Sequence, residues 1–173
     1  MPLYALGEHS PQIHESAYIH PDAVIIGNVT IGAESTVWPT AVLRGDFGII
    51  TVGARTSIQD GAVIHTRATQ PTHIGDDCVV GHNVHIEGSS IGDGTLIGSG
   101  STVLPGCTIG NNALVGAQAL VSPNTVIPDF AKAIGVPARV SENSVEPGFA
   151  SSNVAVYVEA GKRYKKELRL FEG

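Results

Sequence analysis

The chain has 173 residues, a formal net charge of −6 and only 15% charged side chains, which suits one domain around a continuous apolar core. An acidic chain with no basic cluster before residue 162 argues against a nucleic-acid-binding protein and against a protein of anionic membrane surfaces. No apolar run approaches the ~20 residues of a membrane span, and two cysteines without a secretory leader predict a cytoplasmic protein.

An aliphatic residue recurs at every sixth position, with a small residue two positions earlier and often a glycine directly after it. A period of six fits neither a 3.6-residue helix nor a hairpin sheet. It fits short strands separated by turns, in which the aliphatic and the small residue face inward. The aliphatic positions are Ile13, Ile19, Ile25, Ile31, Val37, Leu43, Val52, Ile58, Ile64, Ile74, Val80, Ile86, Ile91, Ile97, Val103, Ile109, Val115, Val121 and Ile127.

This repeat resembles that of the hexapeptide-repeat family, whose fold is a left-handed parallel β-helix. The resemblance implies a mainly β chain of one domain, with the β-helix over residues 10–140. Three hexapeptides make one triangular coil in that fold, so residues three repeats apart stack on the same face at the spacing of neighbouring strands, about 4.8 Å.

A change of period marks the C-terminal segment. Its apolar residues alternate by three and four, which predicts an amphipathic helix over residues 152–172 that packs along one outer face of the β-helix. The residues of this stripe are Val154, Tyr157, Gly161, Tyr164, Leu168 and Phe171.

Several repeats carry a polar residue at the outward position that glycine usually takes. Arg44, His65 and Glu87 follow aliphatic residues that lie three repeats apart, so the stacking rule places them in one column on one face. Asp46 lies two residues beyond Arg44, at the same corner.

A second set of polar residues lies at another edge of the predicted solenoid. The same count stacks Asp60 with His82, and Gln59 with Gly81. A solenoid this thin has little interior in which to bury such groups, so they face water or a neighbouring subunit. A functional site built from both sets would therefore lie between chains.

Five stretches of the chain resemble the γ-class carbonic anhydrases and their bacterial homologues. The stretches are RGDFGIITVG (44–53), SIQDGAVIH (57–65), VGHNVHIEG (80–88), GSGSTVLPGCTIGNNALVGAQALV (98–121) and AIGVPARV (133–140). The resemblance covers about residues 10 to 140 and the terminal helix. It implies a homotrimeric lyase that hydrates CO₂ to bicarbonate, with a divalent metal at each subunit interface.

Three histidines hold the metal in that family, two from one chain and one from the next. Two of them match His65 and His82, whereas the third position is Glu87 in this chain. His85, two residues before Glu87, is the alternative ligand or a pocket residue, and a chain without a tightly bound metal is the third possibility. Because two histidines and one carboxylate form a competent catalytic set, we expect zinc, with iron or cobalt as alternatives.

Four further residues complete the catalytic set that the resemblance implies. Arg44, Asp46 and Asp60 match residues that form charged contacts between subunits near the metal. Gln59 matches a residue that hydrogen-bonds the metal-bound water, so its amide would orient the attacking hydroxide.

Three functions follow from these observations. The first is a γ-carbonic-anhydrase-like metalloprotein, whose activity is weakened because Glu87 lowers the effective charge of the metal. The second is a hexapeptide acyltransferase or thioesterase that acts on coenzyme A esters. The third is a non-catalytic trimer that binds a metal or a siderophore. Metal analysis, a CO₂-hydration assay and titration with coenzyme A distinguish them.

Overall fold

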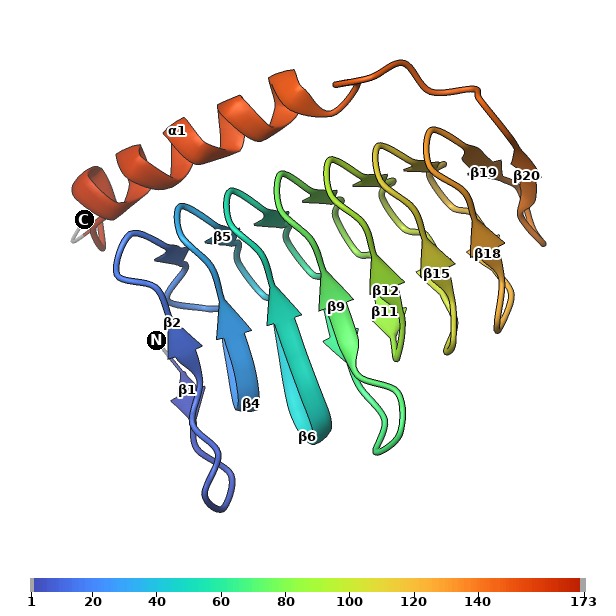
Figure 1. Cartoon of the computed structure of the whole chain (residues 1–173). Coiled ribbons are helices and arrows are strands. Elements are labelled where there is room, and N and C mark those ends of the chain that lie inside the picture. The colour runs from blue at the N-terminus through green and yellow to red at the C-terminus, as the bar shows by residue number, and fades with distance from the viewer. Residues whose placement is uncertain (1, 172–173) are drawn as a thin grey trace.

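The computed structural model describes residues 2–171, and within them it shows a parallel β-solenoid with one helix along its side (Figure 1). The strands form two sheets, one of twelve strands and one of eight. The larger sheet covers two faces of the solenoid, because β4 and β6 continue around the corner that separates these faces. The predicted left-handed β-helix of hexapeptide repeats is confirmed.

Each coil contributes one strand to each of three faces. The first face holds β1 (Leu3–Tyr4), the first halves of β4 (Val24–Ile31) and β6 (Val42–Val52), then β8 (Val63–His65), β11 (His85–Glu87), β14 (Thr102–Val103) and β17 (Leu120–Val121). The second face holds β2 (Gln12–Ile13), the second halves of β4 and β6, then β9 (Thr72–Ile74), β12 (Ser90–Ile91), β15 (Thr108–Ile109) and β18 (Val126–Ile127).

The third face is the eight-stranded sheet, which lies under the helix (Figure 1). It holds β3 (Tyr18–Ile19), β5 (Thr36–Val37), β7 (Ser57–Ile58), β10 (Val79–Val80), β13 (Leu96–Ile97), β16 (Leu114–Val115), β19 (Lys132–Ile134) and β20 (Arg139–Ser141). Within residues 2–171 the named strands pair in parallel, except that β19 and β20 pair antiparallel at the C-terminal end of the solenoid.

Stacked aliphatic side chains form the core, in the register that the repeat predicts. Leu43 pairs with Ile64, and Ile64 pairs with Ile86, and all three side chains are fully buried. Burying one such side chain contributes about 1.5–3 kcal/mol. The two cysteines, Cys78 and Cys107, are buried free thiols.

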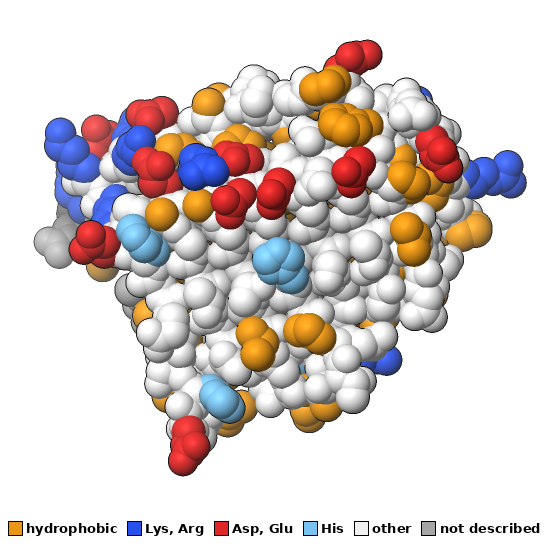
Figure 2. All heavy atoms as spheres, viewed as in Figure 1, with side chains coloured by type: hydrophobic (Ala, Val, Ile, Leu, Met, Phe, Trp, Pro, Cys, Tyr) orange, Lys and Arg blue, Asp and Glu red, His pale blue; other side chains and the backbone are white. Residues whose placement is uncertain are grey.

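Polar side chains bind the coils together at the corner beside the helix. Asp93 Oδ1 accepts a hydrogen bond of 2.8 Å from the backbone N–H of Asp76, and Asn111 Oδ1 accepts one of 2.8 Å from that of Asp93. Asp129 continues the ladder by accepting one of 2.7 Å from Asn111. Figure 2 shows acidic side chains in a row along this edge. The hydrogen-bond ladder explains these carboxylates without a ligand.

Helix α1 (Ser151–Glu167) packs on β3, β5 and β7 of the third face. Trp38 lies beneath it, with its ring centroid 5.8 Å from that of Tyr157 and 5.1 Å from that of Tyr164. Gly161 permits a close approach, since a Cβ there would lie 2.5 Å from Thr36 Cγ2. The predicted apolar stripe is therefore confirmed from Val154 to Tyr164.

The end of the helix differs from the prediction. Leu168 is already extended, and the side chains of Leu168 and Phe171 are exposed. No strand of the third face precedes β3 within residues 2–171, so the stripe has nothing left to cover beyond Tyr164. Residue 172, the last of the predicted helix, lies outside the described residues. Helix α1 is neither long enough nor apolar enough to cross a membrane.

Candidate functional site

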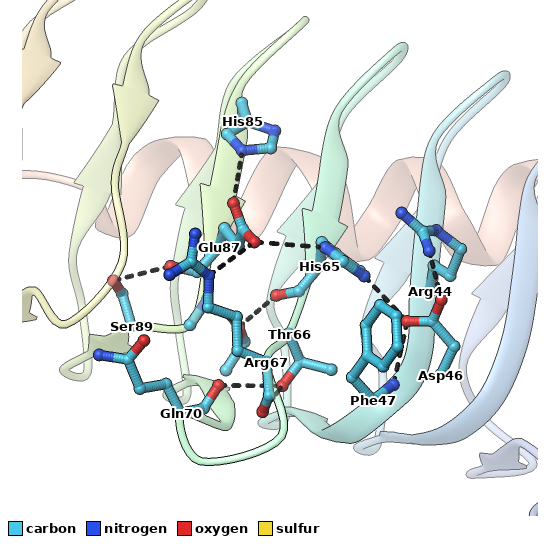
Figure 3. A network of polar contacts seen from close by, with 12 residues as sticks. Arg44, Asp46, Phe47, His65, Thr66, Arg67, Gln70, His85, Glu87 and Ser89 are labelled. Atoms are coloured by element: carbon cyan, nitrogen blue, oxygen red, sulfur yellow. Dashed lines mark hydrogen bonds and ion pairs between the residues drawn. The ribbon is translucent and has the colours of Figure 1, made fainter. Parts of the chain in front are cut away.

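A charged column runs across the first face, where the stacking rule predicts it (Figure 3). Arg44 on β6 pairs in register with His65 on β8, and His65 pairs with Glu87 on β11. The strand period of two turns all three side chains outward. We call Arg44, Asp46, His65, Arg67 and Glu87 the His65 column.

Asp46 anchors one end of the column. Its Oδ1 lies 2.8 Å from Nε2 of His65, and Arg44 donates a hydrogen bond to its other oxygen. Partial burial alone would raise the pKa of Asp46, but the hydrogen bonds from His65 and Arg44 outweigh it and lower that pKa. The Phe47 ring packs edge-on against the His65 ring, with centroids 5.9 Å apart.

Glu87 anchors the other end. Arg67 Nε donates a hydrogen bond of 3.0 Å to Glu87 Oε1, and the same oxygen lies 3.6 Å from His65 Nδ1. His85 Nε2 lies 3.8 Å from the second carboxylate oxygen, so His85 points outward from the same strand as predicted. Partial burial acts to raise the pKa of Glu87, but the hydrogen bond and charge of Arg67 outweigh it and lower that pKa.

Sequence reasoning missed Arg67. It lies on the insertion between β8 and β9, where the backbones of Arg67 and Gln70 pair through hydrogen bonds of 3.1 and 3.2 Å. This tight loop directs the guanidinium back over Glu87 (Figure 3). The sequence carried one signal for it, namely a basic residue in the insertion that directly follows the candidate ligand His65.

The donor set of one chain does not fit a metal ion. Both ring nitrogens of His65 face carboxylates, and Glu87 is held by Arg67. His82 follows β10 on the third face and is absent from the column. No group of three or more His, Cys, Asp or Glu side chains in residues 2–171 is arranged to hold a metal. Such a site would need His82 from another copy of the chain.

His82 forms a separate pair on the third face. Its Nδ1 lies 3.0 Å from Oδ2 of Asp60, as the predicted stacking of these two residues requires. Each of the two side chains is about half exposed, at 49% for His82 and 47% for Asp60. Nε2 of His82 has no hydrogen-bond partner among the described residues, so one ring nitrogen lies against a carboxylate and the other is free.

His82 lines a groove of about 380 Å³ between the third face and helix α1, which we call the His82 groove. Gln59 also lines it, and this residue is only 4% exposed. The side-chain amide of Gln59 makes no hydrogen bond within residues 2–171 and is not among the fully enclosed unpaired groups, so it is open to the groove. The remaining lining residues are Val79, Gly81, Leu96, Ile97, Gly98, Ser99, Asn153, Val156 and Tyr157.

Helix α1 contributes Tyr157 to this groove. Burial, and then the negative charge of Asp60, raise the pKa of the Tyr157 phenol. The phenol therefore remains a neutral hydrogen-bond donor near neutral pH. Sequence reasoning treated Tyr157 only as part of the packing stripe, and no motif marked the helix as part of a site.

The structure divides the predicted catalytic set. Arg44 and Asp46 lie with His65 on the first face, whereas Asp60 and Gln59 lie with His82 on the third face. The predicted assignment of His65 and His82 to different edges is confirmed. The roles of these residues at a metal stay predictions.

The repeat matches the model of a known protein family. The family model described as "Bacterial transferase hexapeptide (six repeats)" matches residues 10–45, 71–105 and 88–123, which together make up just over half of the chain. The carnitine operon protein CaiE of Escherichia coli is 38% identical over 96 residues, which are 56% of this chain and 49% of that protein. The chain thus matches about half the length of this curated relative.

Solved structures resemble the chain over more of its length. A putative acetyltransferase of Bacillus cereus is 36% identical, with a TM-score of 0.90 over 94% of this chain and 96% of that one. A mutant of perosamine N-acetyltransferase from Caulobacter crescentus, in complex with CoA and GDP-perosamine, is 28% identical, with a TM-score of 0.56. That match covers 76% of this chain and 56% of the other.

Proposed function

This chain belongs to the bacterial transferase hexapeptide family, and we propose that it transfers an acyl group from a coenzyme A thioester to a small nucleophile. The single observation that carries the proposal is the His82–Asp60 pair, with 3.0 Å between Nδ1 and Oδ2, at the wall of a groove. A histidine held at one nitrogen and free at the other has the arrangement of a general base.

The reaction follows from this geometry. Oδ2 of Asp60 lies 3.0 Å from Nδ1 of His82, which favours the tautomer with the proton on Nδ1 and the lone pair on Nε2. Nε2 takes the proton of an amine or hydroxyl nucleophile as the new bond to the thioester carbonyl carbon forms. The carbon–sulfur bond then breaks, and the leaving thiolate takes up the proton from His82. The acyl group ends on the nucleophile, and free coenzyme A is released.

The relatives support this reaction more than a hydration. The B. cereus structure carries the description of a putative acetyltransferase, and the C. crescentus enzyme holds CoA in its complex. The sequence expectation of a carbonic anhydrase therefore becomes the second candidate.

We further propose a homotrimer that works in the cytoplasm. Hexapeptide-repeat proteins commonly form trimers. The exposed apolar side chains of Val63 on the first face and of Phe47, which packs on His65, lie beside the His65 column, as expected for a surface that another copy covers. The two free thiols suit a reducing compartment.

The test is release of coenzyme A from acetyl-CoA or butyryl-CoA in the presence of a panel of amines and alcohols. Wild type should release thiol in proportion to acceptor consumed, and H82N should not. H85N is the matched control, since His85 is a partly exposed histidine of the first face. An H82N protein as active as wild type would overturn the proposal.

The second candidate is a γ-class hydration of CO₂ to bicarbonate at a divalent metal, with zinc expected first and iron or cobalt as alternatives. The register that places His65 beside Glu87 favours it, since two ligands of a two-plus-one set then lie on one chain and His82 would come from the next. A bound divalent cation would supply hydroxide by lowering the pKa of water.

Metal content tests this second candidate directly. The purified trimer, E87A and H85A are compared by elemental analysis, and CO₂ hydration is measured beside them. Stoichiometric metal that E87A alone loses would support the Glu87 ligand set, and loss with H85A alone would identify His85 as the ligand. Metal-free wild type without hydratase activity would exclude the candidate and leave transfer or a non-catalytic binding role.

A further inference from the structure

Gln59 presents an unpaired amide to the His82 groove. The residue is only 4% exposed and lines the groove, and its amide makes no hydrogen bond within residues 2–171. The amide is not among the fully enclosed polar groups without a partner, which among the described residues are the hydroxyls of Tyr18 and Ser101, so it reaches the open space of the groove. A ligand oxygen in the groove can therefore accept a hydrogen bond from it.

The walls of the groove have the composition of an acyl pocket. Val79 and Leu96 of the third face and Val156 of helix α1 form its apolar sides, and His82 stands at the same opening. Its volume of about 380 Å³ lies at the small end of the range for small-molecule sites. The groove therefore suits a small, mostly apolar group with one polar oxygen beside a base.

We propose that the His82 groove is the acyl subsite of the transferase and that Gln59 is a catalytic residue, an inference that rests on the proposed function. The acyl chain of a short, unbranched thioester lies against Val79, Leu96 and Val156. The Gln59 amide donates a hydrogen bond to the carbonyl oxygen as negative charge develops on it, while His82 takes the proton of the nucleophile.

Helix α1 sets the length of chain that the subsite accepts. Val156 and Tyr157 form the outer wall, and the aromatic contact of Tyr157 with Trp38 fixes that wall at a centroid distance of 5.8 Å. A larger side chain at position 156 would shorten the groove without entering the core, since Val156 is 63% exposed. Chain-length preference thus depends on a residue that the fold does not need.

The test compares transfer from acetyl-, butyryl- and hexanoyl-CoA by wild type, V156W, Q59L and A155W. We expect V156W to lose roughly 10–100-fold in kcat/KM for hexanoyl-CoA while acetyl-CoA is spared, as a few methylenes in a pocket allow. A155W is the matched control, because Ala155 is the adjacent exposed residue and lines a different groove with Arg55 and Asp77. It should keep the wild-type preference.

Q59L tests the amide. Loss of a donor to the developing oxyanion should lower kcat by about 10²-fold with little change in KM. A Q59L protein that unfolds at lower temperature but keeps kcat would overturn the role, as would a V156W protein with unchanged chain-length preference.

Direct titration separates the inference from the proposed function. Butyryl-CoA is titrated calorimetrically into each protein without an acceptor. Binding that V156W weakens and A155W preserves supports the acyl subsite even if no acceptor in the panel is acylated. Transfer that proceeds in wild type with equal butyryl-CoA binding by V156W and A155W would overturn the subsite and leave the transferase intact.

Discussion

The two histidines at the centre of this molecule have opposite surroundings. His65 on the first face has Asp46 2.8 Å from one ring nitrogen and Glu87 3.6 Å from the other. His82 on the third face has Asp60 3.0 Å from Nδ1, and its Nε2 is unengaged by the described residues. Both histidines belong to the hexapeptide-repeat pattern. His65 ends β8 and His82 comes shortly after β10, and both side chains point outward.

The difference teaches what each site can do within one chain. A histidine between two carboxylates, with Arg44 and Arg67 beyond them, is a closed network of charges in which each group already has its partner. A histidine with one free nitrogen, beside an amide that makes no hydrogen bond within the described residues, has capacity left for a ligand. We therefore assign a stabilising role to the His65 column and the chemistry to the His82 groove.

Substituting each histidine in turn should give the largest difference between the two regions. H82N should lower kcat for acyl transfer by about 10²–10⁴-fold, the usual contribution of a general base, and D60N should produce part of that loss. H65N should mainly lower stability. The measurement is the rate of thiol release at saturating acyl-CoA, with thermal unfolding of each variant as the control for folding.

A side chain at position 161 should weaken the packing of helix α1 on the third face. In G161A the added Cβ would meet Thr36 Cγ2 at 2.5 Å, so we expect the free energy of unfolding to fall by about 1–3 kcal/mol. The double variant G161A/T36S removes that methyl group and keeps the hydroxyl that accepts a hydrogen bond from Trp38. It should recover most of the loss in urea unfolding, and failure to do so would contradict the close-contact explanation.

Acid should weaken the column. The folded-state pKa values of Asp46 and Glu87 are lowered, so the stability that these carboxylates contribute is present above their unfolded values near pH 4 and is lost as pH falls below them. D46N should therefore flatten the fall in unfolding free energy between about pH 5 and pH 2. D22N, at an aspartate whose side chain is 72% exposed, is the control for loss of a carboxylate outside the column.

Removing the loop arginine should have the smallest effect. Arg67 is 55% exposed, and an ion pair at such a position contributes under about 1 kcal/mol. R67Q should lower the unfolding free energy by no more than that and leave acyl transfer intact. R55Q, which breaks the bidentate, partly buried pair of Arg55 with Asp77, is the control for loss of an arginine outside the column. A large loss of acyl transfer in R67Q, without a similar loss in R55Q, would show that the His65 column takes part in the reaction.

The repeat predicted much of this arrangement. A count of three repeats per coil placed Arg44, His65 and Glu87 in register, and it separated His82 from them, because strand period and coil length are local properties of the sequence. The count could not place Arg67, whose position depends on the closure of an irregular loop.

Nor could the sequence assign Tyr157 to a site. The three- and four-residue spacing of the helix predicts which face packs, but the groove exists only because α1 lies across the third face at one particular height. The unpaired amide of Gln59 is likewise a property of the packed structure. The groove and its open amide depend on contacts between segments that lie far apart in the sequence, which local patterns do not predict.

The rate of acyl transfer by a metal-stripped H65N/E87Q protein tests the central claim most directly. These substitutions interrupt the column at both carboxylate contacts and leave the His82 groove untouched. We expect kcat to stay within roughly threefold of wild type, since sites that share no partner act independently. A loss as large as that of H82N, about 10²-fold or more, would contradict the account and place the chemistry at the His65 column.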